Sequence, residues 1–326
     1  MRRVAALVCA CCAAVAQAAP KDAAEPVAAW PSRPVRLIAP FVAGGPTDIV
    51  ARLVALKTGE NLKQTVVVDN RGGASGAVGM EIAAAAPPDG YTLVLGSSAN
   101  LAVNPALNPR LPYDVMRDFQ PLTQTTSGPQ IIAVHPALPA KSVPELVALA
   151  KARSGQLNYA SGGSGTTMHL GFELFKLATG TNIVHVPYKG TGQALTDVLG
   201  GQVQMIMASM LPAQPHVKSG RLRGLAVTSA RRAAVFPELP TVAESGVPGF
   251  ETVSWHGVAV PARTPKALAQ RIHAELVKAL THPEVRSAFA NQGMDVVAST
   301  PPEFVAYIKG ESAKWTRVVK TIGIKE

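Results

Sequence analysis

Two short segments of the 326-residue chain combine glycines with hydroxyl side chains in a way that suits the binding of an anion. Residues 161–167 read Ser-Gly-Gly-Ser-Gly-Thr-Thr, and residues 40–48 read Pro-Phe-Val-Ala-Gly-Gly-Pro-Thr-Asp. Each segment lies between an expected strand and an expected helix. The free N–H groups and the positive end of the helix dipole would favour a carboxylate or phosphate there. The alternative is an ordinary strand-to-helix turn, in which Asp48 supports the first turn of its helix.

Nucleotides fit residues 161–167 poorly, because the segment lacks the Gly-Lys-Ser/Thr ending of a P-loop and the acidic residue of a dinucleotide-binding motif, ~20 residues further on. Three more loops, residues 96–100, 186–192 and 208–210, also follow expected strands and are rich in small or hydroxyl-bearing residues. In open α/β sheets the ligand crevice lies outside the carboxyl ends of the strands. The five loops together predict a polar pocket for a small anion, with no cofactor.

Catalytic motifs are absent from the sequence. It has no Gly-x-Ser-x-Gly elbow, no His-Glu-x-x-His motif and no close pair of carboxylates on one expected helix face. The best pair for an enzyme acting on a small acid is Ser164 with His169, but no third group is evident to orient the histidine. The seven histidines show no metal-ligand spacing, and all three cysteines fall within the first twelve residues. We therefore expect a binding protein without catalytic residues or metal ions.

Short apolar runs alternate with helical patterns after residue 34, which is typical of an α/β fold. The runs expected to be strands are residues 35–41, 65–69, 91–96, 131–135, 157–160, 183–186, 203–208 and 222–228. Apolar residues recur three and four apart in the expected helices, which are residues 47–59, 166–178, 193–199, 265–280 and 302–322. Trp255 and His256 lie in a further apolar run, where core packing is the default and a place in a pocket wall the alternative.

Two stretches mark where the chain is expected to pass between lobes. Residues 126–130 are polar and separate two series of strands and helices, and residues 236–250 are rich in proline and glycine. We therefore expect a first lobe over residues 35–130 and a second lobe over residues 131–235. Residues 236–326 would return through a hinge and complete the first lobe. Such a double crossing leaves a cleft between the lobes, the usual place for a ligand.

The N-terminus predicts export to the periplasm. Arg2 and Arg3 precede an apolar run over residues 4–15 that ends in Ala-Gln-Ala, which is the pattern of a secretory signal peptide and its cleavage site. We expect a signal peptide over residues 1–18 and an N-terminal arm, rich in alanine and proline, over residues 19–34. A lipid anchor at Cys11 is the alternative, but the apolar run ahead of that cysteine is short. Either form would face the periplasm.

The formal charge of +10, from 31 basic and 21 acidic residues, is spread along the chain and mildly favours an anionic ligand. The densest basic pairs, residues 221 with 223 and 231 with 232, lack the interleaved aromatic residues that bind nucleic-acid strands. We therefore expect no nucleic-acid partner.

Seven ordered segments, spread over nearly the whole mature chain, resemble the solute-binding receptors of tripartite tricarboxylate transporters, known as the Bug family. They are residues 40–48, 69–76 (Asp-Asn-Arg-Gly-Gly-Ala-Ser-Gly), 88–93 (Pro-Asp-Gly-Tyr-Thr-Leu), 111–114, 157–161, 185–190 and 240–246. The resemblance implies an α/β, two-lobed periplasmic-binding-protein fold, type II-like, with the ligand cleft between the lobes. It also implies capture of a small carboxylate, such as a di- or tricarboxylate or an aromatic acid, or of a related polar metabolite.

The same resemblance implies partners and site residues. A receptor of this family, expected to be a monomer, hands its ligand to membrane permease subunits or signals to a sensor kinase, and holds the ligand mainly by backbone N–H groups and hydroxyls. The residues it carries over are Gly44, Gly45, Thr47, Asp48, Ser161, Ser164, Gly165 and Thr166, with Ser98, Tyr188, Gly190 and Ser209 as second choices. Our hypothesis is that the helices after residues 40–48 and 161–167 point their N-termini at one shared carboxylate.

Two positions depart from the pattern that the resemblance implies. Gly72 stands where relatives usually have proline, and Ala208 where many have aspartate. The glycine would loosen a turn. The alanine removes a carboxylate that could meet an amino or amide group, which favours a ligand without a cation.

Overall fold

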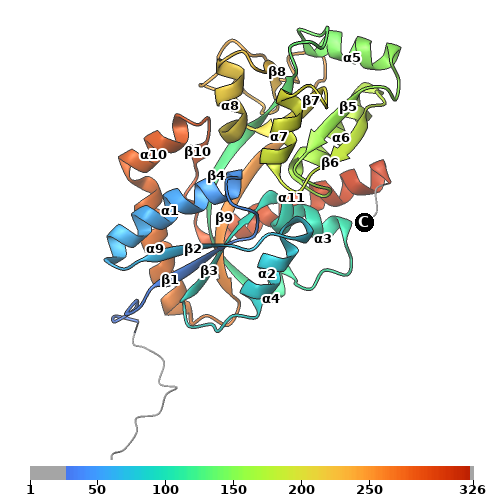
Figure 1. Ribbon diagram of the computed structural model, residues 1–326. Helices are drawn as coiled ribbons and strands as arrows, with labels where there is room; N and C mark the ends of the chain where they lie inside the picture. Colours follow the sequence, from blue (N-terminus) through green and yellow to red (C-terminus); the bar gives the residue numbers. More distant parts are fainter. Residues whose placement is uncertain (1–26, 324–326) are drawn as a thin grey trace, which may run out of the picture.

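The computed structural model describes residues 27–323 (Figure 1). The expected signal peptide, the alternative lipid anchor at Cys11 and residues 19–26 of the expected arm lie outside the described residues. Within residues 27–323, no helix is long and apolar enough to cross a bilayer.

The first lobe is built on three parallel strands in the order β2-β1-β3. These are β1 (Val35–Ala39), β2 (Val66–Asn70) and β3 (Thr92–Ser97). The helices between and after them are α1 (Pro46–Leu62), η1 (Ala74–Gly76), α2 (Ala77–Ala84), η2 (Ala99–Val103), α3 (Asn104–Leu107) and α4 (Val115–Asp118). Because parallel strands share one direction, the loops after β1 and β3 open at the same edge of the sheet. The start of α1 therefore lies near the residues that follow β3.

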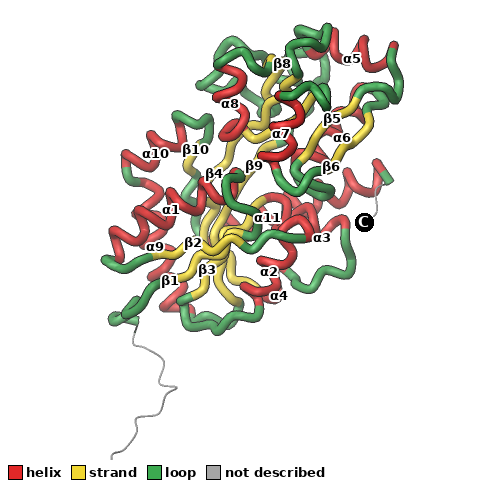
Figure 2. Tube along the Cα trace, in the orientation of Figure 1, coloured by secondary structure: helices red, strands yellow, loops and turns green. Residues whose placement is uncertain are grey.

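Two long strands connect the lobes. The first, β4 (Phe119–Val134), pairs antiparallel over most of its length with β9 (Val253–Pro261), and β9 also pairs with β3. The last residues of β4 pair instead with second-lobe strands. Figure 2 shows these strands passing from one lobe into the other. Residues 126–130, expected to separate the lobes, are thus part of a continuous strand, and the described residues form one ten-stranded sheet.

The second lobe repeats the α/β pattern. Its elements are α5 (Val143–Ala152), β5 (Asn158–Ser161), α6 (Thr167–Thr179), β6 (Val184–Pro187), α7 (Thr191–Leu199), β7 (Met205–Ser209), α8 (Met210–Lys218) and β8 (Arg223–Val227). Strand β5 runs parallel to both β6 and β7, and β7 and β8 pair antiparallel with the end of β4. The loops after β5, β6 and β7 therefore open at one edge of this part of the sheet, toward the first lobe.

Residues 236–250, expected to begin the return, pack with the second lobe. Phe236, Val242 and Phe250 are buried in its core clusters. We propose that the return to the first lobe begins at β9 and not at residue 236. The chain ends with α9 (Lys266–Thr281), α10 (Pro283–Ala290), β10 (Asp295–Val296) and α11 (Pro301–Ile322), and the start of α11 carries a capping box between Thr300 and Glu303.

Apolar packing joins the lobes on both sides of the crossing strands. One first-lobe cluster lies between the sheet and helices α1 and α9, and it includes Leu211 from α8 of the second lobe. The other lies under α2 and α11 on the opposite face, and it includes Leu170 from α6. One leucine from each of two second-lobe helices is thus buried in a first-lobe core.

A buried carboxylate fastens β9 to α11. The indole N–H groups of Trp255 and Trp315 both donate to Glu311 Oε2, each at 3.1 Å. The Lys314 ammonium lies 3.3 Å from Glu311 Oε1. The side chains of Glu311, Trp255 and Trp315 are all buried. Glu311 therefore fixes β9, which passes beside the cleft, against α11.

We expect Glu311→Ala to lower the free energy of unfolding by about 2–4 kcal/mol, because two buried indole N–H groups would lose their acceptor. Urea unfolding followed by tryptophan fluorescence measures the loss. Glu238→Ala, a change at an exposed glutamate, is the control. Equal stability of the two variants would show that the indole bonds contribute nothing.

Candidate functional site

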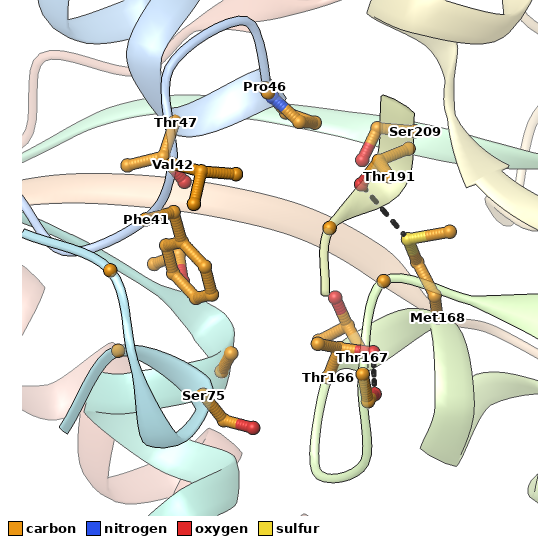
Figure 3. A pocket seen from close by; sticks show the side chains of 18 of the residues that line it. Phe41, Val42, Pro46, Thr47, Ser75, Thr166, Thr167, Met168, Thr191 and Ser209 are labelled. Carbon is orange, nitrogen blue, oxygen red and sulfur yellow. Dashed lines mark hydrogen bonds between the residues drawn. The ribbon is translucent and has the colours of Figure 1, made fainter. Parts of the chain in front are cut away.

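A cavity of about 520 Å³ lies between the lobes, at the edge where the loops after the parallel strands meet (Figure 3). The first lobe lines it with Phe41, Val42, Gly45, Pro46, Thr47, residues 72–76, Ser97, Ser98 and Ala99. The second lobe lines it with Gly162, Gly163, residues 166–168, residues 188–191 and Ser209, and β9 contributes Ser254 and His256. The predicted pocket at the carboxyl edge of the strands is therefore present in the structure.

The N-terminus of α1 faces this cavity without a side-chain cap. Its N-cap residue is Gly45 and its first residue is Pro46, which has no N–H and suits the first helical position. The Gly44 N–H donates to Asp48 Oδ2 at 2.9 Å, and Arg52 pairs with the same oxygen at 3.0 Å. Burial acts to raise the pKa of Asp48, but the bonds from Arg52 and Gly44 outweigh it and lower the pKa. Asp48 therefore stabilises the loop as a carboxylate and does not line the cavity.

Helix α7 of the second lobe is also uncapped at the cavity, as are α2, with N-cap Gly76, and α8, with N-cap Ser209. The N-cap residue of α7 is Gly190, with φ of 142°, and no side chain caps its first turn. A Cβ atom at Gly190 would lie 3.0 Å from Val42 Cγ2, so glycine lets this loop approach the loop before α1. Uncapped N-termini from both lobes, α1 and α7 among them, thus come together at one cavity.

The N-terminus of α6 does not fit the hypothesis that α1 and α6 share one carboxylate. The Thr166 hydroxyl accepts a bond from the His169 N–H at 3.3 Å and donates to the Gly163 carbonyl at 2.8 Å. Its own side chain therefore caps the helix that was expected to face α1. Thr166 lines the cavity, but the uncapped N-termini of the second lobe belong to α7 and α8 and not to α6.

The structure brings seven of the twelve expected site residues to the cavity and places five outside its lining. The seven that line it are Gly45, Thr47, Ser98, Thr166, Tyr188, Gly190 and Ser209. The five that do not line it are Gly44, Asp48, Ser161, Ser164 and Gly165. These five belong to the same loops, where they hold the backbone in place.

A stack of rings supports the loop over residues 161–166 from below. Ser161 Oγ lies 2.7 Å from His185 Nε2, and the Gly165 N–H donates to His169 Nδ1 at 3.1 Å. The two imidazoles stack with centroids 4.1 Å apart, and Tyr159 stacks on His185. Because His169 Nδ1 accepts from Gly165, it is occupied by the backbone, and the Ser164–His169 pair considered for an enzyme is not assembled.

Residues 72–76 were part of a recognised segment but were not expected at the site. Ser75 has φ of 50°, and its hydroxyl donates to the Ser164 carbonyl of the other lobe. A Cβ atom at Gly72 would lie 3.1 Å from the Val42 nitrogen, so this glycine allows close packing of two cavity loops. The glycines of this segment could have indicated from the sequence that it lies at the site, because glycine permits close approach of the backbone to a ligand.

The cavity is almost free of charged side chains. Among the described residues that line it, Lys189 alone carries a full charge, and none is Asp or Glu. His256 is fully buried, and burial lowers its pKa to about 4, so it is neutral at pH 7. No cluster of three or more potential metal ligands occurs in residues 27–323. The site therefore offers N–H groups, hydroxyls and apolar walls, which suits a small anion with an uncharged body.

A two-lobed α/β fold with uncapped helix N-termini meeting in an interlobe cavity defines a periplasmic solute-binding receptor. The model of the tripartite tricarboxylate transporter family receptors matches residues 50–324, and the chain belongs to this family. The protein BugT of Bordetella pertussis is 40% identical over 305 residues, which cover 93% of this chain and 94% of BugT. The resemblance to the Bug family and the α/β binding-protein fold expected from the sequence are both confirmed.

Two solved structures with bound acids are similar along nearly their whole length. Rpa4515 of R. palustris with adipate is 36% identical, with a TM-score of 0.88, covering 91% of this chain and 99% of that one. MatC of Rhodopseudomonas palustris with bound malate is 30% identical, with a TM-score of 0.84, covering 89% and 100%. The structure of the periplasmic binding protein BugD is 33% identical, with a TM-score of 0.86, covering 91% and 99%.

The stacked histidines predict a loss of stability in acid. Burial is the main cause that lowers the pKa of His169 to about 4, compared with about 6.5 in an unfolded chain. Between these values the unfolded state binds more protons, so stability is full above pH 6.5 and falls as the pH drops toward 4. At pH 5 the lowered pKa of this histidine should reduce the free energy of unfolding by about 2 kcal/mol, relative to its value above pH 6.5.

The variant His169→Asn keeps an acceptor for the Gly165 N–H but does not titrate. Between pH 7.5 and 5.0, we expect its free energy of unfolding to fall by about 2 kcal/mol less than that of the wild type. Urea unfolding at both pH values measures the difference. His282→Asn, at a half-exposed histidine that caps α10, is the control. A pH dependence in His169→Asn as steep as in the wild type would contradict the assignment.

Proposed function

We propose that this protein is an exported periplasmic receptor that captures a small carboxylate for a tripartite tricarboxylate transporter. The observation that carries the proposal is the meeting of uncapped helix N-termini from both lobes, α1 and α7 among them, in a cavity whose described lining has no acidic side chain. Helix N-termini favour anions through their free N–H groups and the helix dipole. The adipate and malate bound to the related Rpa4515 and MatC support a carboxylate.

A shared carboxylate would link ligand capture to closure of the lobes. One oxygen would accept from the first-turn N–H groups of α1, beside Thr47, and the other from the Thr191 N–H of α7. Because the donors come from different lobes, the ligand binds the closed arrangement more strongly and shifts the population toward it. Backbone donors are held in place by their helices, so little ordering is needed on binding.

We further propose that the protein carries out no catalysis, acts as a monomer, and delivers its ligand to membrane permease subunits. Its expected signal peptide supports a periplasmic location. The alternative role, signalling to a sensor kinase, would use the same fold and cavity. Genes for a large and a small permease subunit beside this one would favour transport, and a two-component pair beside an isolated gene would favour sensing.

We expect small carboxylates to raise the melting temperature of the protein. The protein is unfolded and refolded to remove carried-over ligand, then screened against mono-, di- and tricarboxylates and uncharged analogues. A receptor that binds only when folded shows a shift that grows with ligand concentration. A folded protein that responds to none of the acids would overturn the carboxylate function.

The role of α7 is tested by removing one backbone donor. In Thr191→Pro, proline occupies the first helical position, where it is tolerated, and the N–H at that position is lost. We expect the affinity for the best acid of the screen to fall about tenfold or more, because a hydrogen bond to a charged group is lost.

Thr191→Val is the matched control, since it removes only the hydroxyl, which contacts Met168 Sδ at 3.5 Å. Calorimetric titration of both variants gives the two affinities, and circular dichroism checks the fold. Equal affinities would show that the Thr191 N–H does not contact the ligand.

A further inference from the structure

A hydrogen bond joins the two lobes directly beside the cavity. The Ser75 hydroxyl of the first lobe donates to the backbone carbonyl of Ser164 in the second. Figure 3 shows the Ser75 side chain pointing toward the second-lobe loop that carries Thr166 and Thr167. Both partners belong to the protein, so this bond needs no ligand atom in order to form.

The turn that presents Ser75 has an unusual backbone. Residues 73–76 all have positive φ, with values of 133°, 45°, 50° and 93°, and the two in the middle are Ala74 and Ser75. The left-handed region is unfavourable for residues other than glycine, so such a turn persists only where its surroundings hold it. Strained turns of this kind gather at ligand clamps and switches. The backbone therefore points to a role for the position of Ser75.

Contacts within each lobe hold the two partners of this bond in place. In the first lobe, Asn104 of α3 is buried, and its Nδ2 group donates to the Ser75 carbonyl at 3.0 Å. In the second lobe, the N–H of Gly165, the residue after Ser164, donates to His169 Nδ1 at 3.1 Å. Donor and acceptor are thus each fixed by their own lobe, so little ordering is needed when the lobes meet.

The bond lies between the cavity and a second hollow of about 310 Å³. Ala74 and Ser75 line both spaces, and Ser164 lines the second. The contact between the lobes is therefore thin at this point, with open space on either side of it. Breaking the bond would open the cavity toward the hollow.

The lobes also touch at α8, but that contact is packed. Leu211 of α8 is buried in a first-lobe core cluster, and Gln214 Nε2 donates to the Asn291 carbonyl at 3.1 Å. This contact contains none of the residues around the Ser75 bond. A change at Ser75 can therefore alter the closure of the lobes without disturbing their packing at α8.

We propose that the turn over residues 73–76 is a latch that holds the lobes closed before a ligand binds. The latch stabilises the closed arrangement alone, so its loss shifts the population toward the open one. Closed protein is thus populated without ligand, and a ligand that enters adds to a closure that the latch has already favoured. This inference does not depend on which ligand the cavity takes.

The balance between open and closed protein tests the latch. The chain has no cysteine after residue 12, so Ala85→Cys in the first lobe and Ala152→Cys in the second, both at exposed alanines, carry one spin label each. Pulsed electron double resonance gives the label distances in the mature protein, refolded to remove carried-over ligand. The population whose distance matches this structure is the closed one. In Ser75→Ala we expect the ratio of closed to open protein to fall at least about threefold, because a hydrogen bond is lost.

Two further variants separate the hydroxyl from the shape of the turn. Ser75→Gly removes the same hydroxyl and adopts φ of 50° without strain, so it should also lower the ratio. Ser164→Ala is the matched control, because the acceptor is the backbone carbonyl and the Ser164 side chain lies outside the cavity lining. It should keep the wild-type ratio.

The latch is overturned by an unchanged ratio in Ser75→Ala, by a fall that Ser75→Gly does not share, or by an equal fall in Ser164→Ala. A wild type without any closed population would overturn it as well. Because no ligand is added, none of these results bears on the carboxylate function.

Discussion

The antiparallel pairing of β4 with β9 is the constraint on which the rest of the molecule depends. It is the longest register in the sheet, running from Phe119 with Pro261 to Pro129 with Val253. Beyond it, β4 continues into the second-lobe sheet and β9 joins β3 of the first. Because the same two strands carry both lobes, they set the separation across which α1 and α7 face each other. His256 and Ser254, which line the cavity, lie on this shared pair.

The recognition that we propose for this cavity relies on backbone more than on charged side chains. Asp48, the stacked His169 and His185, and Ser161 lie behind the lining, where they fix loops whose N–H groups are presented to the ligand. A backbone donor cannot be changed by most substitutions, so related receptors can keep the anion site while the residues around the ligand body vary. In this chain the side chains of Phe41, Val42 and Met168 give that part of the cavity an apolar lining.

The sequence predicted the fold well where hydrophobic pattern and local structure agree. Strands such as β1, β3 and β7 are mostly apolar, and each was expected within two residues of its observed limits. Residues 119–130 of β4 were missed because Thr125, Thr126, Ser127 and Gly128 are polar or small, and pairing with β9 overrides their weak strand preference. The strand β9 itself was noticed only as an apolar run around Trp255.

The site was predictable at the level of loops but not of individual residues. Glycine and hydroxyl residues after strands identified the right edge of the sheet. Which of them line the cavity depends on contacts between distant segments: Ser161 is turned toward His185, 24 residues later, and Ser164 receives the Ser75 hydroxyl from the other lobe. The caps of α6 and α7 differ only through Thr166 and Gly190, and that difference becomes meaningful once α1 is seen opposite α7.

The late position of β9 in the chain also has a consequence for biosynthesis. Strand β3 has β1 on one side and needs β9 on the other, yet more than 150 residues separate β3 from β9. The first lobe, although synthesised first, cannot complete its sheet until most of the chain has emerged, and such distant pairing forms slowly. A chain whose N-terminal half cannot finish folding until β9 has been synthesised stays unfolded for longer, which would suit the export that we propose for this protein.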